Sequence, residues 1–248
     1  MRTAIIIPAR LAATRLPNKL LQALGDRPLI ACTAAQARKC KNVDEVVVAT
    51  DDESIKRVVE AHGGHAVMTD VGHASGTDRV AEAAAIVGAD LVVNLQGDEP
   101  FIHPLDLEDL FQILRQQRTN LATLATPITE MWDWENPNVV KVVCRDDGQA
   151  LYFSRAKIPF DRDSRHGLKG TMRHIGVYGY QRDALNRLSR TPPHPLEQRE
   201  CLEQLRALAL GMSIAVVPSR SVTLGIDTAE DLARARARVQ QLGETAFP

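Results

Sequence analysis

The sequence predicts an α/β fold in which one mostly parallel β-sheet is covered by helices. Short, continuous apolar runs recur along the first half of the chain, and stretches with helical periodicity separate them. The chain has 248 residues, of which 44% are hydrophobic, and this is enough for one large domain with a sizeable core. We therefore expect a single domain that spans residues 1–248.

The expected strands of this sheet are short and apolar, as parallel strands buried on both faces usually are. They occupy residues 4–8, EVVVAT (45–50), HAVM (65–68) and the first part of DLVVNLQGDEP (90–100). The last of these runs directly into a polar turn. Parallel strands joined by helices place such turns together at one edge of the sheet.

Helices are expected between the strands, and several begin with a recognisable signal. Pro28 opens a helix to about Lys39, since proline is favoured in the first helical turn. Ser75-x-x-Asp78 and Thr228-x-x-Asp231 have the spacing of a capping box. The apolar stripe Leu107, Leu110, Phe111 and Leu114 indicates another helix, and a long helix is expected over about 196–210.

The alternation of strands and helices ends at about residue 121. Strand-like segments then follow one another with few helical turns between them: LATLATPI, NVVKVVCR, QALYFS and RHIGVYGY. We interpret roughly 128–180 as a β-rich excursion from the main sheet. Exposed strand edges tend to find partners, so this excursion is a candidate dimer contact.

Composition excludes several classes of protein. The net charge of −1 gives no overall basic field for nucleic acid. The four scattered cysteines favour neither a disulfide framework nor a zinc site and fit a reducing cytoplasm. No apolar run has the length of a signal region or of a membrane span, so a cytoplasmic protein is expected.

Charged side chains follow several of the expected strands. Arg10, Arg15 and Lys19 could neutralise phosphates, although a solvated loop would also contain such cations. Asp98 and Asp227 are hard oxygen ligands, and magnesium typically takes one or two carboxylates together with substrate phosphates. The alternative for Asp227 is a plain N-cap of the last helix.

The motifs IIPARxxxTRLPNK, VATDDE, SGTDRVAEA, VVNLQGDEP, ALYFSRAKIPFDRD, RHIGVYGY, LEQLRAL and GIDTAEDL together resemble the 3-deoxy-manno-octulosonate cytidylyltransferases. The resemblance runs in order from about residue 4 to 238. Asn18 departs from it, because the family usually has glycine there; asparagine tolerates left-handed backbone better than most residues do. Ala12 and Ala13 also depart from the usual pair.

The resemblance implies a Rossmann-like fold of the nucleotide-diphospho-sugar transferase type, with a β-rich dimerisation subdomain. It implies that the cationic loop surrounds the phosphates of CTP and that Ser75, Gly76 and Thr77 approach the cytosine. The nucleotide-binding residues expected from it are Pro8, Ala9, Arg10, Arg15, Lys19, Thr50, Asp51, Ser75, Gly76, Thr77, Arg79 and Gln96.

The resemblance also implies a pocket for the acidic sugar Kdo. In it a guanidinium would bind the carboxylate of Kdo, and neutral and anionic acceptors would bind its hydroxyls. Its residues would be Gln96, Arg155, His174, Tyr178, Glu203 and Gln204. Without the resemblance, His174 would be interpreted as a structural histidine, and Glu203 with Gln204 as solvated helix surface.

The implied reaction is CTP plus Kdo giving CMP-Kdo and diphosphate for lipopolysaccharide assembly, in a homodimer, with two magnesium ions. Lys19 and Arg10 would act in catalysis beside the metal carboxylates Asp98 and Asp227.

Three alternatives remain open at this point. A CMP-sugar synthetase for sialic acid or 8-amino-Kdo would share the CTP loop and differ in the sugar pocket. A regulatory nucleotide-binding module would lack the metal carboxylates. A Rossmann oxidoreductase would have Gly-x-Gly-x-x-Gly after its first strand, and PARLAATR has none.

Overall fold

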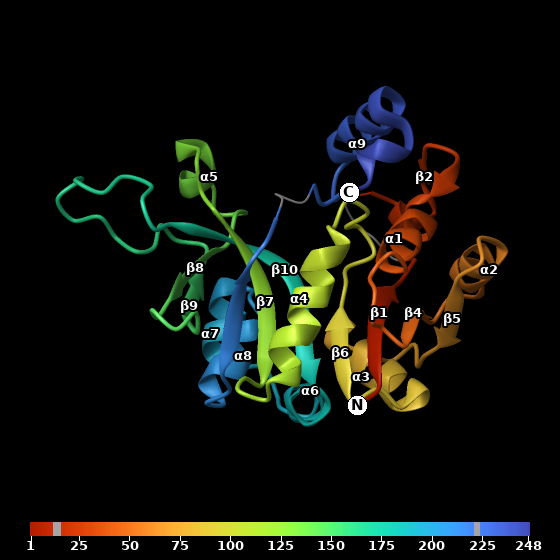
Figure 1. The fold of residues 1–248 in the computed structure, drawn as a ribbon, viewed down its shortest axis with the longest axis horizontal. Coiled ribbons are helices and arrows are strands. Elements are labelled where there is room, and N and C mark those ends of the chain that lie inside the picture. Colours follow the sequence, from red (N-terminus) through yellow and green to blue (C-terminus); the bar gives the residue numbers. More distant parts are fainter. Residues whose placement is uncertain (12–15, 221–223) are drawn as a thin grey trace.

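A mixed sheet forms the centre of the computed structural model, which describes residues 1–11, 16–220 and 224–248. Within these residues the sheet has nine strands (Figure 1). Seven of them lie in the order β11 (Ile214–Pro218), β7 (Leu121–Pro127), β10 (Met172–Gln181), β6 (Leu91–Asn94), β1 (Thr3–Ala9), β4 (Glu45–Thr50) and β5 (His65–Met68). Only β10 runs antiparallel to its neighbours in this series. The predicted mostly parallel sheet is confirmed.

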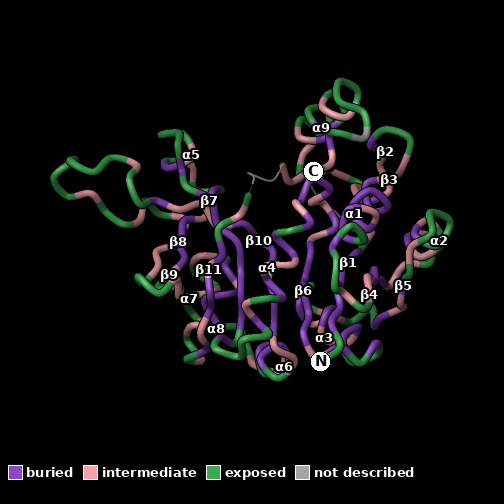
Figure 2. Tube along the Cα trace, viewed as in Figure 1, coloured by how far each residue is buried: buried purple, intermediate pink, exposed green. Residues whose placement is uncertain are grey.

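Helices cover both faces of the sheet because successive strand residues point to opposite sides. Ile5 and Ile7 of β1 belong to one buried cluster, which contains residues of α1 (Leu29–Ala37), α2 (Glu53–Ala61) and α4 (Pro104–Arg115). Ala4 and Ile6 belong to a second cluster, with α3 (Gly76–Val87), α6 (Arg182–Ser189) and α8 (Gln204–Ala209). Figure 2 shows the buried strands between these layers.

The region 128–180 forms an arm beside the sheet. It contains α5 (Met131–Glu135), β8 (Lys141–Cys144), β9 (Ala150–Ser154) and a long loop that projects from the body in Figure 1. The arm is joined to the sheet because β10 has two partners on one side. The C-terminal end of β10, residues 178–181, pairs with β6. Met172 and Arg173, at the start of β10, pair with β8. Strands β6 and β8 therefore diverge along β10.

The remaining elements are short, apart from the last helix. They are η1 (Lys19–Leu21), the hairpin of β2 (Ala23–Leu24) and β3 (Arg27–Pro28), α7 (Pro195–Glu200), α9 (Ala229–Leu242) and η2 (Gly243–Ala246). Among the described residues, no helix combines the length and the apolar character that a membrane span requires.

Two of the expected helix boundaries differ from the structure. The long helix predicted over 196–210 is wrong: α7 ends at Glu200, Cys201 adopts left-handed backbone at φ 52°, and α8 starts at Gln204. A non-glycine residue rarely takes that conformation, so the sequence gives little sign of the break. Pro28 is the N-cap of α1 and not its first helical residue.

Both predicted capping boxes are present. Ser75 caps α3 together with Asp78, and Thr228 caps α9 together with Asp231. The second result decides against the plain N-cap alternative for Asp227, because the capping side chain is that of Thr228. The carboxylate of Asp227 contacts the ammonium of Lys19 at 2.9 Å.

Candidate active site

One cation and two carboxylates meet at the carboxyl ends of the strands. The ammonium nitrogen of Lys19 lies 2.5 Å from Oδ2 of Asp98 and 2.9 Å from Oδ1 of Asp227. Lys19 lies in η1 after β1, Asp98 follows β6, and Asp227 precedes α9. The sheet therefore brings together three groups that are far apart in sequence, as predicted from the strand ends.

Close packing fixes the approach of Lys19 to Asp98. A Cβ atom on Gly97 would lie 3.0 Å from a methyl group of Leu20 in η1, so a larger residue here would require the Leu20 side chain to shift. Asn18, just before η1, has left-handed backbone at φ 50°. This is the conformation that the sequence led us to expect for an asparagine in place of the family's glycine.

The charges of the cluster depend on one another. Burial raises the pKa of the Asp98 carboxyl above its usual value, although Lys19 acts against this effect. Burial alone would lower the pKa of Lys19, but the two carboxylates outweigh it and the pKa is raised. The ammonium thus stays charged and offsets part of the negative charge of the two carboxylates.

The carboxylates fit a magnesium ion that is completed by a ligand. No group of three or more His, Cys, Asp or Glu side chains among the described residues could hold a metal by itself. Magnesium usually takes only one or two protein carboxylates and completes its octahedron with water and phosphate oxygens. Asp98 and Asp227 supply that number, and both already contact one cation, the ammonium of Lys19.

A small cavity of about 170 Å³ opens where β1 ends and α3 begins. It combines a guanidinium with small residues and with the first turn of a helix, where unpaired backbone N–H groups favour an anion or a polar ligand. Its lining residues are Pro8, Ala9, Arg10, His73, Ser75, Gly76, Arg79 and Gln96.

A large cavity of about 420 Å³ lies where β6 and β8 diverge along β10. A bulge in β10 between Ile175 and Tyr178 adds to this opening. The side chains of His174, Tyr178, Glu203, Gln204 and Asp227 are among those that line it. Asp227 therefore joins the large cavity to the charged cluster.

The rings in the large cavity are neutral and packed. The centroids of His174 and Tyr178 are 5.3 Å apart. Burial lowers the pKa of His174 to about 3, so the imidazole is uncharged at neutral pH. Its Nε2 lies 3.0 Å from the hydroxyl of Thr123. Burial also raises the pKa of Tyr178 well above its usual value, which keeps the phenol protonated.

This chain is similar to known proteins over most of its length. A family model described as cytidylyltransferase matches residues 4–214. The 3-deoxy-manno-octulosonate cytidylyltransferase of Rhodospirillum centenum is 48% identical over 94% of this chain and 91% of its own length. The Geobacter sulfurreducens protein of the same name is 41% identical over 94% of this chain and 97% of its own. The chain belongs to the 3-deoxy-manno-octulosonate cytidylyltransferase family.

A solved structure of CMP:2-keto-3-deoxy-manno-octonic acid synthetase complexed with CTP superposes with a TM-score of 0.92. It is 40% identical in sequence and covers 97% of this chain and 99% of its own. A cytidylyltransferase from Leptospira borgpetersenii, at 19% identity and a TM-score of 0.67, shares the fold.

Seven of the residues predicted to bind nucleotide from the family resemblance line the small cavity: Pro8, Ala9, Arg10, Ser75, Gly76, Arg79 and Gln96. His73 also lines it and was missed; its only sequence signal is its place just before the Ser75 turn. Arg15 lies outside the described residues.

Other predicted nucleotide residues support the walls. The guanidinium of Arg79 contacts Asp51 at 2.8 Å and Thr69 at 2.5 Å. Thr50 is fully buried, and its hydroxyl accepts a hydrogen bond from the backbone of Asp52. Thr77 does not line the small cavity, and its hydroxyl donates to Glu203.

The large cavity contains four of the predicted sugar residues, His174, Tyr178, Glu203 and Gln204, but not Gln96 or Arg155. The guanidinium of Arg155 instead donates to backbone carbonyls of Pro137, Glu200 and Cys201 at 3.1, 2.7 and 3.4 Å. It holds the corner between α7 and α8 that forms one wall.

Arg173 and Asn138 line the large cavity and were not predicted. Arg173 stands next to His174 in the motif RHIGVYGY, so its neighbour was the available signal. Alternation along a strand does not predict that both line one cavity, since adjacent residues normally face opposite ways. Both residues line the same cavity, which opens where β6 and β8 diverge along β10.

We predict that the substitution Lys19→Met exposes the cation site. Without the ammonium, Asp98 and Asp227 repel each other, and we expect a loss of about 2 kcal/mol in the free energy of unfolding in metal-free buffer. Millimolar magnesium should then raise the melting temperature of the variant more than that of the parent. Thermal melts with EDTA and with magnesium measure this, and the surface variant Lys39→Met serves as control. An equal magnesium response in variant and parent would argue against a cation site.

Proposed function

We propose that this chain transfers the cytidylyl group of CTP to Kdo and releases diphosphate. Family membership supports the reaction class, and the curated relatives carry the name of this activity. The observation that carries the proposal is the arrangement of two cavities around one charged cluster. Asp227 lines the large cavity, and Gln96, just before the Gly97–Asp98 turn, lines the small one.

In this proposal the small cavity holds CTP. Arg10 at the end of β1 and the nearby Lys19 place positive charge where the phosphates lie, and the first turn of α3 offers backbone N–H groups. Bound magnesium, one ion on Asp98 and Asp227 and a second on the triphosphate, would supply Lewis-acid charge to the reacting phosphate.

The large cavity holds Kdo beside the α-phosphate. The amide nitrogen of Gln204 is buried and has no partner among the described residues, so it is a ready donor to a sugar oxygen. The neutral His174 and the protonated Tyr178 add polar groups without adding charge. Arg173 places a guanidinium in the same cavity for the sugar carboxylate.

Chemistry then needs only one in-line displacement. The oxygen of the anomeric hydroxyl forms a bond to the α-phosphorus, the bond from that phosphorus to the bridging oxygen breaks, and diphosphate leaves. The hydroxyl proton passes to solvent. Positioning and electrostatic stabilisation supply most of the rate in such transfers. The four free cysteines fit a reducing cytoplasm, where the product would supply lipopolysaccharide assembly.

The direct test is diphosphate release from each nucleoside triphosphate with Kdo, 8-amino-Kdo and sialic acid, with and without magnesium. We expect release only with CTP, Kdo and magnesium together. The variants Asp98→Asn and Asp227→Asn should each lower kcat at least about 100-fold, because each removes charge from the metal site. Circular dichroism checks the fold, and Asp26→Asn, an exposed carboxylate, is the matched control. Normal turnover in either site variant would remove that residue from the mechanism.

We predict that Arg155→Gln raises the KM for Kdo by about 10- to 100-fold and leaves the KM for CTP unchanged. The guanidinium holds the wall of the large cavity, and a hydrogen bond to a charged group is worth about 1.5–3 kcal/mol. Steady-state kinetics in both substrates measure the effect. Arg145→Gln, in the exposed turn of the same arm, is the control. An equal rise in both KM values would assign Arg155 to the fold as a whole.

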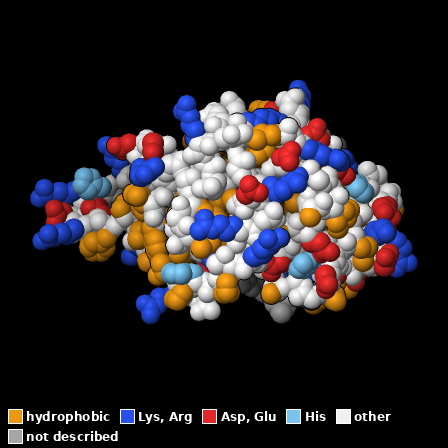
Figure 3. Space-filling model, turned by 90° about the horizontal axis from the view of Figure 1, so that it is seen from below, with side chains coloured by type: hydrophobic (Ala, Val, Ile, Leu, Met, Phe, Trp, Pro, Cys, Tyr) orange, Lys and Arg blue, Asp and Glu red, His pale blue; other side chains and the backbone are white. Residues whose placement is uncertain are grey.

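The arm supports a further proposal, that the enzyme is a homodimer joined through residues 128–180. Phe160, Trp132 and Leu151 of this region have exposed fractions of 82%, 70% and 56%. Hydrophobic side chains gather where the arm meets the body in Figure 3. Exposed apolar surface of this kind is typical of a protein interface.

Light scattering should therefore give twice the 27.2 kDa chain mass at micromolar concentration. Trp132→Glu should shift the protein toward monomer, because an interface buries this ring and would not accept a charge. Leu242→Glu, on the last helix, should leave the dimer intact. A monomeric parent protein, or a dimer broken only by the change at Leu242, would refute the proposed interface.

A further inference from the structure

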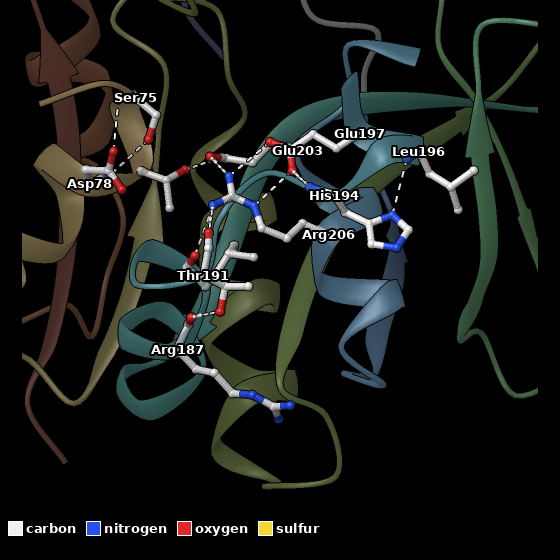
Figure 4. A network of polar contacts seen from close by, with 11 residues as sticks. Ser75, Asp78, Arg187, Thr191, His194, Leu196, Glu197, Glu203 and Arg206 are labelled. Carbon is white, nitrogen blue, oxygen red and sulfur yellow. Dashed lines mark hydrogen bonds and ion pairs between the residues drawn. The ribbon is translucent and has the colours of Figure 1, made fainter. Parts of the chain in front are cut away.

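A side-chain hydrogen bond links the first turn of α3, beside the small cavity, to the wall of the large cavity. The backbone N–H of Glu99 also donates to the carbonyl of Gln96 at 3.2 Å, and these two residues line the large and the small cavity. The hydroxyl of Thr77, in the first turn of α3, donates to the carboxylate of Glu203, just before α8. Thr77 follows Gly76, which lines the small cavity, while Glu203 lines the large cavity itself. Figure 4 shows Glu203 between the capped start of α3 and the side chain of Arg206.

Arg206 fixes the position of Glu203 from the other side. Its Nη2 lies 2.7 Å from Oε1 of Glu203 and 3.0 Å from Oε1 of Glu197. Its Nη1 donates to the carbonyls of Leu188 and Thr191 at 3.1 and 2.7 Å. Only 5% of Arg206 is exposed, so the carboxylate of Glu203 is held against α6 and α7 and cannot rotate independently.

Thr77 is held as firmly on its own side. Only 4% of the residue is exposed, and its hydroxyl has one proton, which is used on Glu203. The capping box between Ser75 and Asp78 fixes the turn that precedes it. Water cannot readily replace a buried hydrogen bond to a charged group. Its loss would leave the carboxylate of Glu203 without one of the two side chains that contact it among the described residues.

We propose that the Thr77–Glu203 hydrogen bond couples the two cavities, so that nucleotide bound at the Ser75–Gly76 turn raises the affinity for the sugar acid. Arg206 is a positioning residue in this coupling. Because Thr77 and Glu203 are held by one hydrogen bond, a nucleotide that stabilises this position of the first turn of α3 also stabilises the position of Glu203 and the adjacent Gln204, and the sugar acid meets these groups already in place. Thermodynamic reciprocity requires the sugar to favour the nucleotide by the same factor. The inference rests on the proposed function.

The test compares the Kd of Kdo with and without a CTP analogue whose α,β-bridging oxygen is replaced by methylene. Calorimetry with magnesium present gives both values without turnover. In the wild-type protein we expect the analogue to tighten Kdo binding at least about fivefold. Thr77→Val removes the hydroxyl at nearly constant volume, and the factor should fall to about one. Thr77→Ser retains the hydroxyl and should retain the coupling.

A matched control separates coupling from stability. Thr119 is 5% exposed, and its hydroxyl donates to the carbonyls of Leu121 and Ser213 at 2.6 and 3.1 Å, beside the start of β7. Thr119→Val loses a comparable buried hydrogen bond far from both cavities. It should lower the melting temperature and keep the coupling factor of the wild type.

Arg206→Lys gives a second route if Thr77→Val does not fold. An ammonium is a compact charge and cannot hold two carboxylates and two carbonyls at once, so the coupling factor should fall while both ligands still bind. If both ligands bind and the factor is unchanged in Thr77→Val, the coupling is overturned and the proposed function stands. If neither ligand binds the wild-type protein, the proposed function fails, and the coupling fails with it.

Discussion

The pairing of β10 is the constraint on which both cavities depend. This strand completes the central sheet through β6 and then carries β8 and the arm. Because one strand edge cannot follow two diverging neighbours at every residue, the pairing on this edge is interrupted between Arg173 and Tyr178. On the opposite edge, the pairing of β10 with β7 has a bulge between Ile175 and Tyr178. The large cavity lies at that interruption. A regular strand in this position would close the space that the proposed sugar site requires.

Much of the fold follows from periodicity alone. The strands at 45–50 and 65–68 have the predicted bounds, and both capping boxes are found where their spacing placed them. The failure at 196–210 has a physical cause. A left-handed cysteine breaks a helix that has no glycine or proline to announce it, and the break is stabilised by tertiary contacts such as that between Arg155 and the carbonyl of Glu200.

The sequence predicts site residues that lie at strand ends. It predicts less well those residues whose position depends on contacts with distant loops. The meeting of Lys19 with Asp98 and Asp227 follows from the rule that parallel strands present their carboxyl ends together. Arg155 shows the limit of that reasoning. A guanidinium after a strand suggests a ligand, but its donors can equally satisfy backbone carbonyls, and only the loops around it decide which.

Lys19, Asp98 and Asp227 are far apart in the sequence, so they leave the ribosome at different times during synthesis. Lys19 and Asp227 are 208 positions apart, and Lys19 and Asp98 are 79 apart. A chain leaving the ribosome can pair the lysine with the first carboxylate long before the second is synthesised. The two-carboxylate arrangement therefore arises only when nearly the whole chain has emerged. Closing a loop of this length costs more entropy than closing a short one, and a partly synthesised chain lacks the complete cluster.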